Sequence, residues 1–436
     1  MIWTATLATV TTRRGPASRL LQMESSKRRR APIPLAHTAW DRIDLTQLVN
    51  AAGLGQFGNW ECSNMTSPLV RRLVASIDQC HEPEGRACRV AELACYWARV
   101  GEFEEAERLR GELRRDFGDG RSVRVSILIM CIEALLLYFR ELSPQARDRM
   151  ARASLLSTAA RESRLIALTS AWMAHIDFNL NRFETMATSL AACLSAIEAD
   201  DGAAICRVSL VLGDAFLFVR ALPASDAWYA RAHAAAAKIG DQAAIGALTY
   251  NRAALHVAGA RLRAINLPLP PSEVKLVLGE VQSAINYQAM ARLRSLDHLL
   301  HSAKVGVMIL QERYAEALPY IANVLTASDV PPNSAERALL QADMALSLAR
   351  TGQTTLAQET VVSLLGADIS SFGADDRAVI WSSVFGASEN LGAPDALQRY
   401  SAEVGAAINQ HNETVARLAA LLTPFEHDLT ILGLSI

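Results

Sequence analysis

Apolar side chains recur at spacings of three and four residues over most of the chain, which is the pattern of amphipathic helices. The clearest example lies between positions 90 and 116, where one apolar stripe passes through two successive helical segments: Leu93, Ala94, Trp97, Phe103, Ala106, Leu109 and Leu113. Gly101 separates the two segments and permits the left-handed backbone that ends many helices. The stretch therefore predicts two antiparallel helices joined by a tight turn.

Similar turns recur at an almost constant spacing. Successive turns are 40, 40, 40 and 39 residues apart in the first part of the chain and 40 and 40 residues apart in the second. The predicted turns lie at Gly101, Glu141, Asn181, Ala221, Ala260, Glu312, Gly352 and Gly392. A period of this length, made of helix pairs, predicts an all-α fold. The expected architecture is an α-solenoid of stacked antiparallel helix pairs that bury their apolar faces against one another.

The interval between Ala260 and Glu312 is 52 residues and breaks this period. The additional residues fall in 261–272, which contains Pro268, Pro270 and Pro271 and precedes a predicted helix over 273–293. We interpret 261–272 as a long loop inserted within one helix pair. Such a loop bends the chain of pairs, presents a binding surface, or is a plain surface insertion of the kind that loops tolerate at little cost.

The pattern divides the chain into four parts. Residues 1–35 contain three prolines and no period, and are expected to form a disordered basic arm; 36–85 form an N-terminal helical cap with helices over 40–52 and 68–79. The repeat blocks are 86–266 and 267–436. The second block ends in an amphipathic stretch over 395–422, one long helix or two in tandem, and an apolar tail over 429–436 that is expected to dock on the protein or on another subunit.

Composition and charge exclude several classes of function. The net charge of −2 divides into +6 for residues 1–30 and −8 for the remainder, so we expect no nucleic-acid binding beyond a weak contribution from 27–30. No run of 18 apolar residues predicts a membrane span, and the charges near the N-terminus follow the apolar stretch, the reverse of a secretory signal. Seven cysteines without paired spacing indicate buried thiols in a reducing compartment, which favours the cytoplasm.

Candidate chemistry is sparse. Residues 53–58 match G-x-G-x-x-G, but a helical pattern rather than a strand precedes them, so we expect no dinucleotide site. His298 and His301 are spaced for one helix face but lack a third ligand, and the group of Cys80, His81 and nearby cysteines is better explained as packing. No catalytic set is evident, so we expect a non-enzymatic protein without cofactor or metal.

The repeat unit resembles the tetratricopeptide repeat. The residues that carry the resemblance, within 86–410, are Leu93, Ala94, Trp97, Gly101, Phe103, Ala106, Leu212, Gly213, Phe216, Tyr229, Ala232, Tyr314, Ala317, Gly352 and Ala357. The first unit has Val90 where the family has Trp and lacks the closing proline, and the period is about 40 rather than 34 residues. The longer period is similar to that of bacterial signalling proteins such as maltose-regulator-type activators and the sensory arrays that precede diguanylate cyclase domains.

In that family the first helix of each pair lines a concave groove, which implies the partner-binding residues here. The groove-facing positions chosen as the site are Trp172, His175, Asn179, Arg207, Asp214, Tyr250 and Asn251. The same mapping also gives Glu92, Arg99, Phe178, Asp343, Arg350, Glu389 and Asn390. Trp, Tyr and Arg dominate the binding energy of many interfaces. The alternative is that these side chains only pack between neighbouring units.

The resemblance implies a protein- or peptide-binding scaffold in bacterial signalling or transcriptional regulation. The alternative is a small-molecule signal sensor with a closed helical superhelix. An open groove favours the scaffold, whereas a closed superhelix with a polar cavity favours the sensor. We expect no membrane partner, and the C-terminal helix is a candidate surface for oligomerisation.

Overall fold

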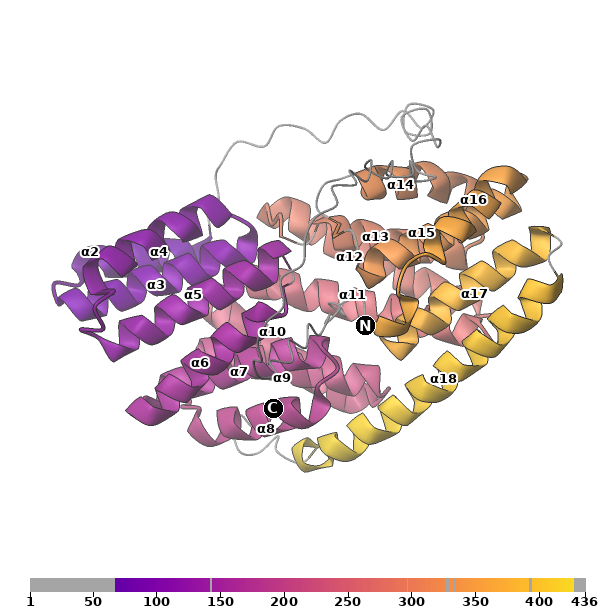
Figure 1. Ribbon diagram of the computed structural model, residues 1–436. Coiled ribbons are helices and arrows are strands. Elements are labelled where there is room, and N and C mark those ends of the chain that lie inside the picture. The colour runs from indigo at the N-terminus through magenta and orange to yellow at the C-terminus, as the bar shows by residue number, and fades with distance from the viewer. Residues whose placement is uncertain are drawn as a thin grey trace, which may run out of the picture.

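A computed structural model describes residues 67–141, 143–295, 297–326, 330–331, 334–391 and 394–426. Every regular element within these ranges is a helix, which confirms the all-α prediction for them (Figure 1). The predictions for the basic arm, for the helix over 40–52, for the glycine motif at 53–58 and for the tail over 429–436 concern residues outside these ranges.

The helices follow one another with short connections. The first ten are α2 (Pro68–Gln79), α3 (Pro83–Val100), α4 (Phe103–Phe117), α5 (Val123–Glu141), α6 (Gln145–Ala160), α7 (Ser163–Asn179), α8 (Phe183–Ala196), α9 (Gly202–Phe218), α10 (Leu222–Ile239) and α11 (Gln242–Ala264). The remaining elements are α12 (Pro271–Ala291), α13 (Asp297–Leu310), α14 (Tyr314–Thr326), α15 (Ala335–Arg350), α16 (Thr354–Leu364), η3 (Ile369–Ser371), α17 (Ala374–Leu391), α18 (Pro394–Leu422) and η4 (Thr423–Phe425). The cap helix over 68–79 and the long helix near 395–422 match the predictions.

Left-handed residues form the turns between paired helices, because a residue with positive φ directs the chain back on itself. Gly101 (φ 89°) and Gly352 (φ 82°) are glycines, whereas Asn181 (φ 56°) and Glu312 (φ 57°) adopt this conformation despite their side chains. These four turns lie at the predicted positions, and the turn before α10 lies at residues 219–221, as expected from Ala221.

One predicted turn is wrong. Ala260 is a fully buried residue inside α11, which continues to Ala264, so the loop predicted over 261–272 is reduced to residues 265–270. Leu262 packs against the core of the second half of the chain, and this contact sustains another turn of helix before Pro268. The helix predicted over 273–293 begins and ends two residues earlier, because Pro271 is a favourable first residue of a helix.

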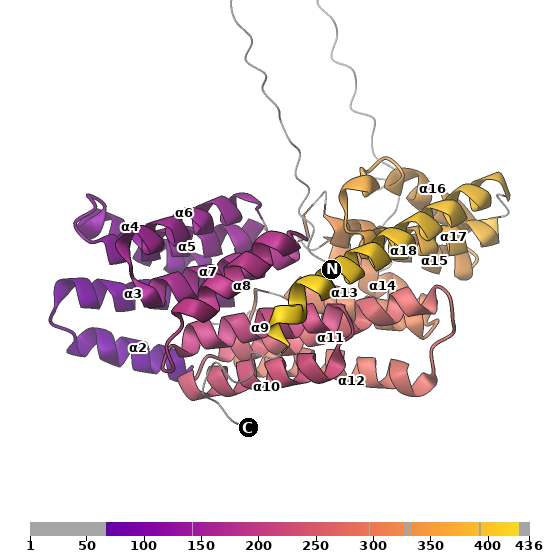
Figure 2. The ribbon, with the colours of Figure 1, turned by 90° about the horizontal axis from the view of Figure 1, so that it is seen from below.

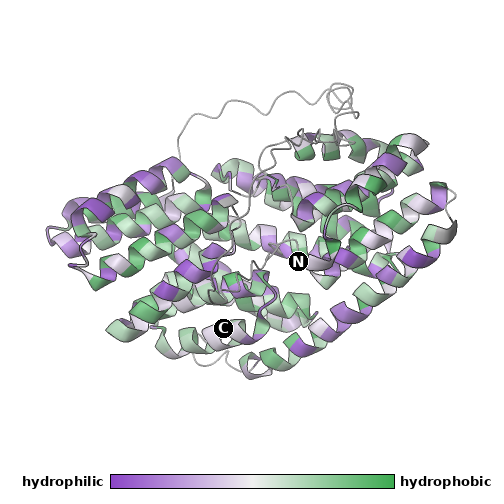
Figure 3. Ribbon diagram, viewed as in Figure 1, coloured by the Kyte–Doolittle hydropathy of each residue, from purple (hydrophilic) through white to green (hydrophobic). Residues whose placement is uncertain are grey.

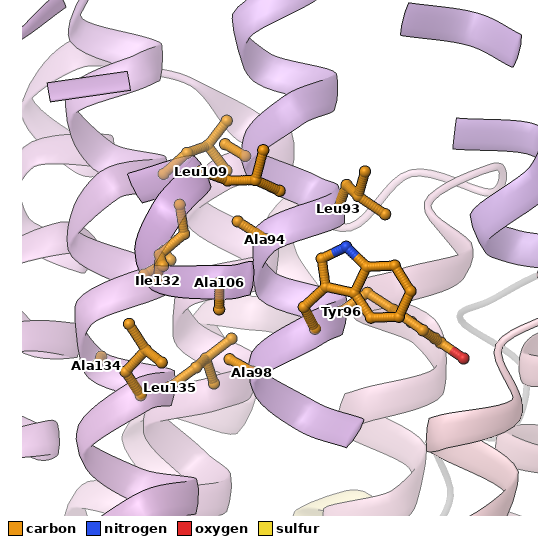
Figure 4. Packing of buried hydrophobic residues seen from close by; sticks show 14 of the residues in the cluster. Leu93, Ala94, Tyr96, Ala98, Ala106, Leu109, Ile132, Ala134 and Leu135 are labelled. Atoms are coloured by element: carbon orange, nitrogen blue, oxygen red, sulfur yellow. The ribbon is translucent and has the colours of Figure 1, made fainter. Parts of the chain in front are cut away.

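The core forms where small residues let the helices approach. Ala94 and Ala106 have no exposed surface and pack with Leu109, Ile132 and other apolar residues of the first cluster (Figure 4). Hydrophobic and hydrophilic residues are interspersed along the helices (Figure 3). None of the described helices is both long and apolar enough to cross a membrane.

Helices far apart in sequence also meet. Helix α18 returns from α17 across the molecule and packs on α8 and α9 (Figures 1 and 2), where Leu418, Leu422 and Phe425 are buried in the cluster that contains Phe183 and Trp228. At the other end of the described chain, the Leu69 backbone N–H donates to the Gly240 carbonyl at 3.2 Å. The Arg294 N–H donates to the Val100 carbonyl, also at 3.2 Å.

Candidate binding site

The residues predicted to bind a partner are mostly buried. Trp172, His175 and Asn179 share one face of α7, as predicted, and are 5%, 6% and 8% exposed. On α9, Arg207 and Asp214 are 5% and 1% exposed. On α11, Tyr250 is 1% exposed and Asn251 is partly buried.

The structure brings four of these residues, Trp172, His175, Asn179 and Arg207, together with Tyr138, which the sequence analysis missed. The Tyr138 hydroxyl of α5 lies 3.2 Å from His175 Nε2 and accepts a hydrogen bond from Asn179 Nδ2 at 2.9 Å. The Trp172 ring meets the His175 ring edge to face, and the Arg207 guanidinium lies 3.7 Å from the centre of the Trp172 ring. Burial, with a contribution from Arg207, lowers the pKa of His175 well below its usual range, so this imidazole is neutral at pH 7.

Asp214 belongs to a separate polar group. Its carboxylate accepts hydrogen bonds from the Tyr229 hydroxyl at 2.6 Å and from Asn251 Nδ2 at 2.7 Å. Burial raises the pKa of Asp214 to about 7, although both hydrogen bonds act in the opposite direction. Tyr250 is not part of either group, because it packs in the apolar cluster formed by α11, α12 and α13.

The other groove-facing positions are dispersed. Glu92, Arg350, Glu389 and Asn390 are exposed at or near helix surfaces, and Phe178 is buried in an aromatic cluster. Asp343 is 1% exposed and pairs with Arg261, which the sequence analysis had placed in a loop. Arg261 also lines a large hollow at the surface.

That hollow, which we call the connector pocket, has a volume of about 450 Å3. It is formed by the end of α11, the 265–270 connector, the α13–α14 turn, α15 and α17. Its polar groups include Asn266, Glu312, Tyr314 and Ser382, and its apolar groups include Leu267, which is 71% exposed. A mixed lining of this size is typical of small-ligand and side-chain pockets.

A buried ion pair lies beside the connector pocket. Arg261 donates two hydrogen bonds to the Asp343 carboxylate, one of them at 2.9 Å from Nη1 to Oδ2. Ser383 donates to Asp343 Oδ1 at 3.0 Å, so the carboxylate is held from both sides. This bidentate geometry fixes the position of the guanidinium, which lines the connector pocket on one side and a second, smaller cavity on the other.

The smaller cavity, which we call the acidic chamber, has a volume of about 40 Å3. Four acidic residues line it, Glu336, Asp343, Asp375 and Asp376, and among the described residues of its lining Arg261 is the one that carries a positive charge. Gly306 permits the close approach of α13 to α11 at this point, since a Cβ there would lie 2.8 Å from Val257 Cγ1.

Glu336 is the distinctive group of the acidic chamber. It is 2% exposed, and its Oε1 accepts a hydrogen bond from the Ser302 hydroxyl. Its Oε2 has no hydrogen-bond partner among the described residues, and His298 Nε2 lies 3.6 Å from it, within ion-pair distance when the imidazole is protonated. Burial raises the pKa of Glu336 to about 7, which places its titration in the physiological range.

The chamber and the connector pocket together suit a ligand with a cationic head. A buried carboxylate oxygen that lacks a donor is costly, and an ammonium or guanidinium group satisfies it with a charge-assisted hydrogen bond. Among the described residues, no group of three or more His, Cys, Asp or Glu side chains has the geometry to hold a metal ion.

Sequence reasoning missed Arg261, Ser302 and Glu336. Two features of the sequence could have pointed to them. One is the 52-residue interval between predicted turns, which contains the connector, and the other is the presence of acidic residues in otherwise apolar helical stretches, such as Ala335–Arg350.

Comparison of the chain with models of protein families, with curated protein sequences and with solved structures gave no match.

Proposed function

We propose that this protein is a non-enzymatic, peptide-binding protein of tetratricopeptide-like helix pairs, whose connector pocket and acidic chamber receive a basic side chain of the partner. The observation that carries the proposal is the buried Glu336 carboxylate, which lines the acidic chamber and has one oxygen without a hydrogen-bond donor. Arg261 lines both this chamber and the connector pocket. A lysine or arginine side chain has the apolar stem and cationic head that this arrangement matches.

Two further observations support the repeat arrangement in this proposal. The first helices of successive pairs contact each other, as in α3 with α5, α7 with α9 and α15 with α17. The two helices of a pair are also in contact, as in α7 with α8 and α9 with α10. The resemblance to bacterial regulatory arrays and the unpaired cysteines of the described residues favour a role in cytoplasmic signalling or regulation.

The second candidate is a sensor of small organic amines. A volume of about 450 Å3 falls within the range of small-molecule sites, and the burial of the middle residues favours recognition inside the protein over recognition on an open groove. The exposed Leu267 at the connector favours the peptide, because it offers apolar contact outside the pocket.

Fluorescence anisotropy with labelled peptides tests the proposal. A library of short peptides with one lysine or arginine is compared with the same peptides carrying norleucine or citrulline. We expect binding that requires the charge and that weakens at least tenfold in Glu336→Gln, since a buried charge pair is broken. The matched control is Glu316→Gln, which removes a 59% exposed carboxylate of α14.

Competition separates the two candidates. If agmatine and spermidine bind as tightly as the best peptide, and both depend on Glu336, the protein is a sensor of amines. If the protein binds neither basic peptides nor amines at millimolar concentration, or if Glu336→Gln leaves their binding unchanged, the proposed function is wrong.

A further inference from the structure

A third, enclosed cavity lies in the other half of the molecule, between α3, α9, α11, α12 and the segment that joins α12 to α13. Its volume is about 10 Å3, the space of one water molecule or one monatomic ion. Three polar side chains that line it decide its chemistry: Arg99 of α3, Arg207 of α9 and Gln288 of α12. Phe139 and Leu293 supply apolar surface around them.

Among the residues that the structure describes, no carboxylate forms an ion pair with the buried Arg207 guanidinium. Its side chain is 5% exposed, and the guanidinium lies 3.7 Å from the centre of the Trp172 ring. By contrast, Arg99 forms an ion pair with Asp241 at 2.8 Å. An arginine buried in this way is costly unless an anion completes its environment.

Gln288 points to the same conclusion independently. The residue is 3% exposed, and neither its amide nitrogen nor its amide oxygen has a hydrogen-bond partner. Its neighbour at the cavity, the Ser295 hydroxyl, is already engaged, because it donates to the Arg99 carbonyl at 2.6 Å. The amide N–H groups of Gln288 are therefore available to a species held in the cavity.

We propose that this cavity binds a single monovalent anion of halide size, with Arg207 and Gln288 as its donors and Arg99 as the neighbouring positive charge. The two arginines and Asp241 leave one positive charge at the cavity, which one such anion neutralises. The volume is too small for phosphate or a dicarboxylate. Because the lining comes from helices distant in sequence, the bound anion joins the first helix pair to α9 and α12.

Thermal unfolding at constant ionic strength tests this site. Replacement of sodium gluconate, whose anion is too large for the cavity, by sodium chloride should raise the Tm of the full chain saturably, by about 2 to 4 °C. The dependence on chloride should disappear in Arg207→Gln and in Gln288→Leu. It should persist in Arg164→Gln, which removes a 58% exposed arginine of α7.

Crystals grown or soaked in sodium bromide give a second readout that does not require the variants to fold. We expect an anomalous bromine peak between the Arg207 guanidinium and the Gln288 amide. A wild-type Tm that does not respond to chloride, together with no bromine peak at this position, would show that the cavity holds only water. Retention of the chloride dependence in both variants would also overturn the proposal.

Discussion

Several polar and charged side chains of this protein are buried between its helices. His175 and Asp214 are each less than a tenth exposed, and each makes hydrogen bonds to a neighbouring helix. Buried polar groups of this kind fix which helices pair and in what register, because a displaced partner leaves them unsatisfied. Single substitutions therefore distinguish packing from binding.

Trp172→Ala tests whether Trp172 serves the core or a partner. The ring is 5% exposed and packs on Phe139, His175 and Arg207, so its removal should lower the free energy of unfolding by about 3 to 5 kcal/mol through the cavity left behind. Urea denaturation measures this loss. A variant of wild-type stability that has lost peptide binding would instead assign Trp172 to the interface.

Glu336→Gln should change how stability depends on pH. The Glu336 carboxyl titrates near 4.5 when unfolded and near 7 when folded, so between these values the folded chain keeps a proton that the unfolded chain has lost. Stability from this group is therefore present below about pH 4.5 and declines as the pH rises to about 7. In the variant this decline, on the order of 3 kcal/mol, should be absent.

Urea denaturation of both proteins at a series of pH values measures the difference. Glu316→Gln should behave as the wild type does, since its carboxylate is exposed. If the stability of the wild type and of Glu336→Gln depends on pH in the same way, burial does not raise the pKa of this carboxyl.

At the scale of the element, two glycine turns form a matched pair. Gly101 and Gly352 both have left-handed backbone, at φ 89° and 82°. A Cβ at Gly352 would meet no atom within 4 Å, whereas a Cβ at Gly101 would lie 3.1 Å from the Ser295 backbone nitrogen. Gly101 is thus in contact with a segment 194 residues away in sequence, and its role extends beyond its own pair.

Gly352→Ala should cost about 1 to 2 kcal/mol from backbone strain alone. Gly101→Ala should cost more, because the added methyl also presses against Ser295. Chemical denaturation of the two variants measures the difference, which estimates how tightly the first helix pair is held to the α12–α13 segment. Equal losses of stability in the two variants would show that the contact between Gly101 and Ser295 can shift without a cost in free energy.

The elements also show what the sequence could and could not predict. Positive-φ turns and apolar spacing act within a few residues, so the turns at Gly101, Asn181 and Gly352 and the helix over 68–79 were predictable. The 40-residue period predicts a turn at Ala260, whereas the local sequence pattern favours a helix there, and the structure follows the local pattern. The Arg261–Asp343 pair joins residues 82 positions apart, and no local signal reveals such a partner.

At the scale of the whole molecule, the C-terminal part of α18 brings the end of the described chain into contact with α8 and α9, which lie in its middle. Leu418 is fully buried against the cluster of α7, α8 and α9. Leu418→Ala should therefore destabilise the protein by about 2 to 5 kcal/mol. Hydrogen exchange should increase in α8 and α9, more than 190 residues earlier in sequence.

Leu155→Ala is the matched control, since Leu155 is 72% exposed and should affect neither quantity. Increased exchange confined to α17 and α18 would contradict the prediction, because it would show that α18 lies on α8 and α9 without stabilising them.

The return of α18 to α8 and α9 also restricts how this chain evolves. A repeat protein with free ends gains or loses units by duplication or deletion, because each unit contacts only its neighbours. Here an additional helix pair between α10 and α17 would move α18 by the width of a helix layer, roughly 10 Å, and separate Leu418 from its cluster. Relatives of this protein should therefore differ in the lengths of their loops and keep the number of their helix pairs.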